Sequence, residues 1–356
     1  MPRNALIKLN DLSPATIGMG FAWVGVMIYA ASNSIATLLV DIGSANPVAG
    51  GRNAITFTNL LFLGSLISLV PMTALFRGDW TRTNLRALSR KDWGLLTLSA
   101  FLSSALTPGL FFFALEHSNV TNVVLVSRIE PPLFLLAAAV FLRERINLRA
   151  LSAGMVALVG ATLMISLRGS GDTCVFDIGE IAAAVATLSY VASAIVARRV
   201  LKSIPMGIFS IYRTVVGAAM YFALVSFLQG PEQFQDLFSP VLLSWIWVYA
   251  IPVIVIGQLA WFFALKYARA SDMSLATSVS PLAGIIFAMV LLGENPGTGF
   301  VPGAALIVAA ICIGQMRDTT WQRMRVILRD GPTAALNLSV SVFASRSIGT
   351  LQGGRA

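Results

Sequence analysis

The sequence is poor in charged, histidine and cysteine residues. Only 12% of its 356 residues are charged, and it contains a single histidine, His117, and two cysteines, Cys174 and Cys312. Two cysteines cannot form a disulfide framework. The sequence also has no His-Glu-x-x-His, Walker A, Gly-x-Ser-x-Gly or Cys-x-x-Cys pattern. We therefore expect neither an enzyme nor an ATP-driven pump, and no metal or cofactor.

Apolar residues dominate the chain. They make up 56% of it, and the mean hydropathy is +0.79. A bilayer core of about 30 Å is crossed by a helix of about 20 apolar residues. Ten runs of this kind span residues 18–40, 47–76, 93–115, 120–142, 148–167, 178–197, 204–228, 241–265, 273–292 and 299–316. Lipid allows only helices or closed barrels to span it, and long, uniformly apolar runs favour helices. We therefore expect an all-α integral membrane protein with ten transmembrane helices.

The distribution of basic residues predicts the topology. Lys and Arg outnumber Asp and Glu by 25 to 16, which gives a net charge of +9. In a soluble chain this excess would indicate a nucleic-acid partner, whereas in a membrane protein Lys and Arg gather in cytoplasmic loops. With a cytoplasmic N-terminus, 21 of the 25 lie in cytoplasmic segments. We therefore expect a multi-pass protein of the cell (plasma or inner) membrane, with both termini cytoplasmic and no nucleic-acid partner.

The chain also contains an internal repeat. Early helices recur at a shift of 161 residues and later helices at a shift of 150, without gaps inside either register. The matched positions include Tyr29 and Tyr190, Arg52 and Arg213, residues 112–115 and 262–265, and Pro131 and Pro281. Repeated sets of helices are typical of secondary transporters.

The repeat divides the chain. Each copy has five expected helices, and because five is odd, the second copy enters the membrane from the opposite side, which inverts it. The expected parts are a cytoplasmic N-terminal segment (1–16), the first repeat (17–167), a linker (168–177), the second repeat (178–316) and a basic cytoplasmic tail (317–356).

The motifs of the two copies resemble a known family. Each copy has an aromatic-Phe-Ala-Leu segment, a turn, a helix with a central proline, and then Leu-x-Glu. In this order and doubled, they resemble the EamA-like family of the drug/metabolite transporter superfamily over residues 17–316. The resemblance implies a secondary transporter of a small molecule, acting as an exporter driven by the proton gradient. We expect a monomer or homodimer in the lipid bilayer. Residues 127–132 depart from the family pattern, which has small apolar residues before a single proline.

Three ionisable residues, Arg128, Glu130 and Arg213, lie inside expected membrane segments. Each would cost about 2.5–3.5 kcal/mol at the bilayer centre, so they should face the protein interior. We interpret Arg128 as a binding residue for an anionic group of the solute and Glu130 as the proton carrier or counter-charge. The alternative is an internal ion-pair network, for example Glu130 with Arg52, that only ties helices together.

Prolines next to these charges predict broken helices. Pro131 and Pro132 lack the N–H groups that a continuous helix requires, and the residue before a proline avoids the helical region. Pro281 occupies the matching position of the second copy. We therefore expect a break in the fourth helix beside Arg128 and Glu130, exposing backbone carbonyls to a central cavity.

Further candidate substrate-binding residues are polar or aromatic side chains within apolar segments. Arg52 and Asn59 share one helix face because they are seven residues apart. The other candidates are Tyr29, Asn33, Tyr190, Gln258 and Trp261. Apolar cavities with a few placed polar groups are typical of small-molecule sites. The alternatives are an interfacial role for Arg52 and interhelical hydrogen bonds for the rest.

The charge balance predicts the kind of solute. Two internal arginines against one internal glutamate favour a carboxylate-bearing solute, such as an amino acid or an organic acid. The alternatives are efflux of amphipathic drugs, a lipid-binding or signalling membrane protein that does not transport, and an unrecognised intramembrane enzyme.

Overall fold

The computed structural model describes residues 13–48, 50–117, 123, 126–145, 147–167, 178–293, 295 and 298–315. The expected linker and tail, and most of the expected N-terminal segment, lie outside this part of the chain. Within it, the secondary structure is helical, apart from one isolated bridge between Val48 and Arg52. The predicted all-α class is therefore confirmed.

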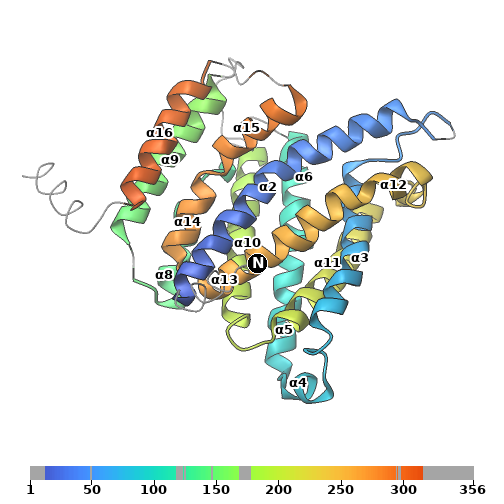
Figure 1. The fold of residues 1–356 in the computed structure, drawn as a ribbon, viewed down its shortest axis with the longest axis horizontal. Helices are drawn as coiled ribbons and strands as arrows, with labels where there is room; N and C mark the ends of the chain where they lie inside the picture. The colour runs from blue at the N-terminus through green and yellow to red at the C-terminus, as the bar shows by residue number, and fades with distance from the viewer. Residues whose placement is uncertain are drawn as a thin grey trace, which may run out of the picture.

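The helices follow one another in two groups (Figure 1). The first comprises α2 (Pro14–Ala45), α3 (Phe57–Phe76), α4 (Arg82–Ala87), α5 (Arg90–Phe101), the π-helix η1 (Leu102–Leu106), α6 (Thr107–His117), α8 (Glu130–Leu142) and α9 (Leu148–Ser166). The second comprises α10 (Ile178–Val200), α11 (Met206–Leu228), the short 3-10 helix η2 (Pro231–Phe234), α12 (Pro240–Tyr249), the π-helix η3 (Ala250–Gly257), α13 (Gln258–Tyr267), α14 (Ala270–Ser278), α15 (Ser280–Leu292) and α16 (Phe300–Gln315).

Many of these helices can cross a membrane. Seven helical stretches of the described residues are long and apolar enough, and three further apolar helices are shorter. The chain is therefore a multi-pass membrane protein, while the count of ten spans in two repeats stays a prediction. The second helix, α3, starts at Phe57 rather than near residue 47, because Thr56 caps it and accepts a hydrogen bond from the Asn59 amide at 3.1 Å.

The fourth expected membrane segment of each group is broken at matching positions, at the start of α8 in the first group and between α14 and α15 in the second. After a turn at Arg128 and Ile129, α8 begins at Glu130, and α15 begins 150 residues later at Ser280, directly after the end of α14. Pro131 and Pro281 lie in the first turns that follow, where a proline needs no N–H partner. The predicted break beside the charged residues is therefore present, together with its counterpart in the second group.

The third expected membrane segment of each group contains a π-helical segment. The α5–η1–α6 stretch runs from Arg90 to His117, and the α12–η3–α13 stretch runs from Pro240 to Tyr267, with both ends shifted by 150 residues. π-helical turns occur often at functional sites. Both π segments line one cavity, which is described below.

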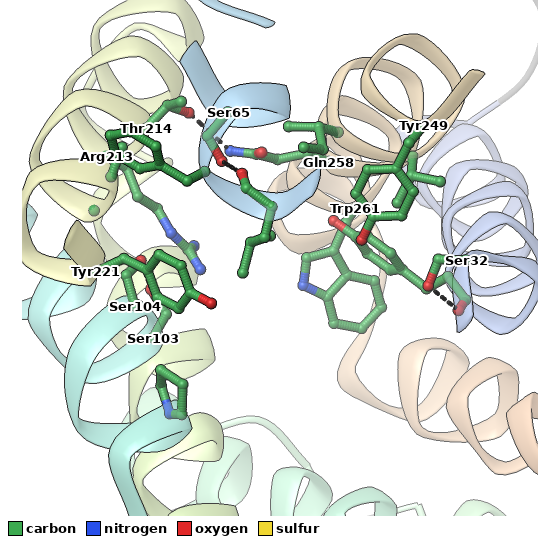
Figure 2. A pocket seen from close by; sticks show the side chains of 18 of the residues that line it. Ser32, Ser65, Ser103, Ser104, Arg213, Thr214, Tyr221, Tyr249, Gln258 and Trp261 are labelled. Atoms are coloured by element: carbon green, nitrogen blue, oxygen red, sulfur yellow. Dashed lines mark hydrogen bonds between the residues drawn. The ribbon is translucent and has the colours of Figure 1, made fainter. Parts of the chain in front are cut away.

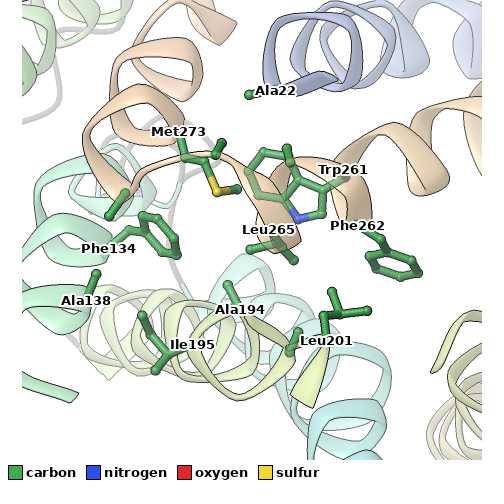
Figure 3. Close-up of a cluster of buried hydrophobic side chains, with 14 of the residues drawn as sticks. Ala22, Phe134, Ala138, Ala194, Ile195, Leu201, Trp261, Phe262, Leu265 and Met273 are labelled. Carbon is green, nitrogen blue, oxygen red and sulfur yellow. The ribbon is translucent and has the colours of Figure 1, made fainter. Parts of the chain in front are cut away.

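A tightly packed apolar core closes one end of the bundle (Figure 3). It is built where the C-terminal parts of α8, α10 and α13 meet the N-terminal parts of α2 and α14. Its labelled members are Ala22, Phe134, Ala138, Ala194, Ile195, Leu201, Trp261, Phe262, Leu265 and Met273. Because both groups contribute helices, this core joins them.

Candidate functional site

Two adjoining cavities are lined by helices of both groups. Each has a volume of about 470 Å³, and they share three lining residues, Tyr29, Tyr190 and Trp261. Tyr29 and Tyr190 come from α2 and α10, and the rings of Tyr29 and Trp261 meet edge to face with centroids 6.4 Å apart. These three side chains therefore form the partition between the two cavities.

We call the first one the aromatic cavity (Figure 2). Seven rings line it, those of Tyr29, Phe62, Tyr190, Tyr221, Tyr249, Trp261 and Phe262. Each π segment contributes two residues, Ser103 and Ser104 from η1 and Val253 and Ile254 from η3. Among the described lining residues, aromatic rings and other polar side chains are equally frequent, with seven of each.

Arg213 supplies the charge of the aromatic cavity. It extends from α11 into the space (Figure 2), with its Cζ atom 5.0 Å from the ring centroid of Phe262 and 5.8 Å from that of Phe209. The Tyr29 and Tyr190 hydroxyls lie near enough to interact with it electrostatically. Within the described part of the chain, Arg213 has no carboxylate partner. Its guanidinium is therefore held by aromatic faces and open to the cavity.

A polar contact crosses the same cavity. The Gln258 Nε2 atom donates a hydrogen bond of 3.2 Å to the Thr214 hydroxyl and thereby links α13 to α11. This bond uses one donor of the amide, so the Gln258 carbonyl oxygen keeps its capacity to accept a hydrogen bond.

We call the second one the charge-pair cavity, because Arg128 and Glu130 line it. Both helix breaks reach it, since Thr277, Ser280 and Pro281 line its other side. Glu130 and Arg128 interact electrostatically, and the buried Arg128 Nε atom has no hydrogen-bond partner among the described residues.

The two broken helices also touch each other. The buried Ser274 hydroxyl of α14 donates a hydrogen bond of 2.9 Å to the carbonyl of Pro131 in α8. This carbonyl stays within the first turn of α8, so the contact fixes the break of one group against the helix of the other.

Most candidates from the sequence lie at these cavities. Arg213 and Gln258 line the aromatic cavity, whereas Asn33, Arg128, Glu130 and Pro281 line the charge-pair cavity, and Tyr29, Tyr190 and Trp261 line both. Pro131 lines a small adjoining space of about 20 Å³, and Pro132 is buried within α8.

Arg52 and Asn59 lie elsewhere. Arg52 is in the loop before α3, and its side chain forms a two-bonded ion pair with Asp236, with both N···O distances 3.0 Å. It therefore pairs with Asp236 and not with Glu130. The hydrogen bond from Arg52 holds the pKa of Asp236 below its usual range. The Asn59 side chain is buried and donates to the Ala54 carbonyl at 3.0 Å, so it fixes the start of α3.

A second ion pair, missed from the sequence, lies at the closed end. Arg198 is buried in the last turn of α10, and its Nη2 atom lies 2.8 Å from Glu144 Oε1 and 2.5 Å from the Ala268 carbonyl. The other Glu144 oxygen accepts from the Ala270 amide at 3.2 Å. This Arg198–Glu144 bridge connects the end of α8 to the α13–α14 junction.

Comparison with known proteins decides the family. The sequence model of the EamA-like transporter family matches residues 16–166 and, a second time, residues 177–314. The chain belongs to the EamA-like transporter family. This family is part of the drug/metabolite transporter superfamily, so the resemblance found from the motifs is confirmed.

Individual relatives agree with this assignment. An uncharacterized transporter of Synechocystis sp., sll1164, is 36% identical over 294 residues, which cover 81% of this chain and 84% of the relative. A riboflavin transporter of Brucella anthropi is 25% identical over 289 residues, which cover 79% of this chain and 96% of the relative. A solved crystal structure has the same fold, with a TM-score of 0.63 at 18% identity over 85% of this chain and 95% of the other. This EamA-like chain is thus a membrane transporter. It lies in the lipid bilayer and acts on a small molecule.

Proposed function

We propose that this EamA-like protein is a secondary transporter that moves an organic anion through the two joined cavities by alternating access of two inverted five-helix halves. The observation that carries the proposal is the meeting of both broken helices at one cavity that holds Arg128 and Glu130. Broken helices at the interface of repeats, with charged groups near the membrane centre, are typical of solute and ion sites in such transporters.

The closed end supports alternating access. In the orientation predicted from the basic residues, the ends of α8, α10 and α13 face the cytoplasm, where the core of Figure 3 and the Arg198–Glu144 bridge join the two halves. A transporter closed on this side admits solute from the other side, and reaches the opposite state when this end opens.

Glu130 is the proposed proton carrier. It lines the charge-pair cavity across the Tyr29–Tyr190–Trp261 partition from the aromatic cavity. Solute and proton would then occupy neighbouring spaces, and a change in the charge of Glu130 would be felt at the partition. Export driven by the inward proton gradient is the direction that we propose.

A second candidate function is efflux of flat amphipathic compounds. One relative is named a riboflavin transporter, and the seven rings of the aromatic cavity offer stacking surfaces to any planar molecule.

Flux into proteoliposomes tests the proposal. The purified protein is reconstituted and given labelled organic acids, amino acids, riboflavin and a cationic dye, under two opposite pH gradients. We expect one class to move against its concentration gradient in the direction set by the pH gradient. Riboflavin or dye flux alone would favour the second candidate, and no gradient-sensitive flux of any solute would contradict both.

A further inference from the structure

We propose that the anionic group of the solute binds Arg213 in the aromatic cavity, and that the solute is an aromatic monocarboxylate. The inference rests on the transport function proposed above and names the class of its substrate. It moves the anion site from Arg128, where the sequence analysis placed it, to Arg213.

The first argument is the charge of the aromatic cavity. Of the described residues that line it, Arg213 is charged and none is Asp or Glu. The aromatic rings of Phe209 and Phe262 stabilise a guanidinium only in part, and an unpaired charge away from water is unfavourable. A carboxylate in this cavity would complete an ion pair that the protein itself leaves open.

The charge-pair cavity lacks this property. Arg128 has the carboxylate of Glu130 nearby and interacts with it, so an incoming anion would be attracted by one group and repelled by the other. With Glu130 ionised, the two charges cancel. This cavity therefore suits a proton on Glu130 better than an organic anion.

The second argument is the chemistry of the walls. Seven rings leave broad apolar faces, while several hydroxyls already donate within their own helices, such as Ser65 to the Leu61 carbonyl and Ser103 to the Ser99 carbonyl. The remaining polar capacity lies at Arg213, the nearby phenols and the Gln258 amide oxygen. A solute with one carboxylate on a flat ring matches this distribution.

The missing acidic group also separates acids from amino acids. An amino acid brings an ammonium group that needs a carboxylate or several carbonyl oxygens in a dry site. No described lining residue of the aromatic cavity is acidic. The cavity therefore favours an organic acid over a zwitterion.

Calorimetric titration of the protein in nanodiscs tests the inference with three matched probes. Phenylacetate carries an aromatic ring and the charge, phenylacetamide carries the aromatic ring without the charge, and cyclohexylacetate carries the charge on a saturated ring. We expect phenylacetate to bind most tightly. Arg213→Gln should weaken it at least about tenfold, since hydrogen bonds to a charged group have this effect, and should abolish its preference over phenylacetamide. Arg213→Lys should keep the preference with weaker binding.

The control is Arg77→Gln, which removes an equal charge from the exposed end of α3 and should leave all three affinities unchanged. The proposal is overturned if Arg128→Gln, and not Arg213→Gln, abolishes the preference for the carboxylate, or if cyclohexylacetate binds as tightly as phenylacetate. If Arg213→Gln does not fold, an unchanged phenylacetate affinity in a folded Arg213→Lys variant overturns it equally.

Flux separates this inference from the function on which it rests. Gradient-driven flux of an aliphatic acid, without phenylacetate binding, would overturn the inference and leave the transport function intact. Absence of flux for every solute would instead contradict the transport function.

Discussion

Arg128, Arg198 and Arg213 are three arginines in apolar segments of the chain, and their neighbours give them different surroundings. Arg198 forms an ion pair and hydrogen bonds that join helix ends, Arg128 lies beside a glutamate, and Arg213 lies against aromatic rings and open space. The same side chain thus serves as a structural tie in Arg198 and as part of a charge pair in Arg128, and it is the proposed binding group in Arg213. The partner, not the residue type, decides the role.

Glu130→Gln should uncouple flux from the pH gradient. Glutamine keeps the size and hydrogen-bonding ability of the side chain but cannot bind or release a proton. In proteoliposomes, we expect the gradient-dependent part of solute uptake to fall to the level without a gradient, while exchange of labelled for unlabelled solute persists. Glu232→Gln, which removes a carboxylate from the exposed side of the short 3-10 helix η2, is the matched control. Gradient-dependent uptake at the normal level in Glu130→Gln would exclude this residue as the proton carrier.

Arg198→Gln should destabilise the closed end. The change leaves the Glu144 carboxylate without its cation. The expected loss of unfolding free energy is about 2 kcal/mol. This is less than for a fully buried pair, because the Glu144 side chain is 27% exposed. A thermal unfolding experiment in detergent should show a melting temperature lower by several degrees.

The neighbouring Arg199 provides the comparison. It is exposed on the same helical turn of α10, so Arg199→Gln removes the same charge without a buried contact, and surface changes of this kind have small effects. Equal melting temperatures for the two variants would show that the bridge contributes nothing to stability.

The helix breaks were foreseeable and the π segments were not. Prolines carry a direct physical signal, because a missing N–H and a fixed φ interrupt a helix wherever they occur, and the break at Arg128 and Ile129 follows from Pro131 and Pro132. A π turn leaves the composition and length of an apolar segment almost the same as those of a regular α-helix, so the sequence does not reveal it. The late start of α3 was also hidden, since the loop before it contains apolar residues such as Val48, Ala54 and Ile55.

Gly18→Ala should separate two helices. A methyl group at Gly18 of α2 would lie 2.2 Å from the Ala268 amide nitrogen and 2.5 Å from the Tyr267 carbonyl carbon, so backbone would have to move. Small residues allow such close approach between membrane helices, and overpacking costs about 1–3 kcal/mol. We expect a lower melting temperature and less folded protein after purification.

Gly20→Ala is its control, because a methyl group there meets nothing within 4 Å. It should be neutral or slightly stabilising, since alanine favours a helix. If Gly18→Ala melts at the same temperature as Gly20→Ala, the approach of α2 to the α13–α14 junction is less close than described.

The inverted arrangement that we propose for the two halves has a direct topological consequence. Reporter tags inserted at Gly78, after α3, and at Glu232, before α12, should report opposite sides of the membrane, with Gly78 in the cytoplasm. The basic residues around Gly78 and their absence around Glu232 give the physical reason. Tags that report the same side would refute the inversion.

The cavities depend on packing that the sequence does not encode locally. Charged and polar residues in apolar runs stand out, which is why Arg213, Glu130 and Gln258 could be selected. Phe62, Tyr221 and Tyr249 could not, because a ring that lines a cavity and a ring that faces lipid look alike along an apolar helix. Arg52 stood out in the same way, but its ion pair with Asp236 could not be predicted, because this partner lies 184 residues away in the sequence.

Access to the aromatic cavity from each side of the membrane is the most direct test of alternating access. In a chain carrying Cys174→Ala and Cys312→Ser, the Ser103→Cys variant places a thiol on the cavity wall, and an anionic, membrane-impermeant methanethiosulfonate is applied to vesicles of either orientation. We expect labelling from both sides, slower from the cytoplasm, with Arg198→Gln raising the cytoplasmic rate several-fold. Labelling from one side alone, unchanged by Arg198→Gln and by added solute, would contradict alternating access.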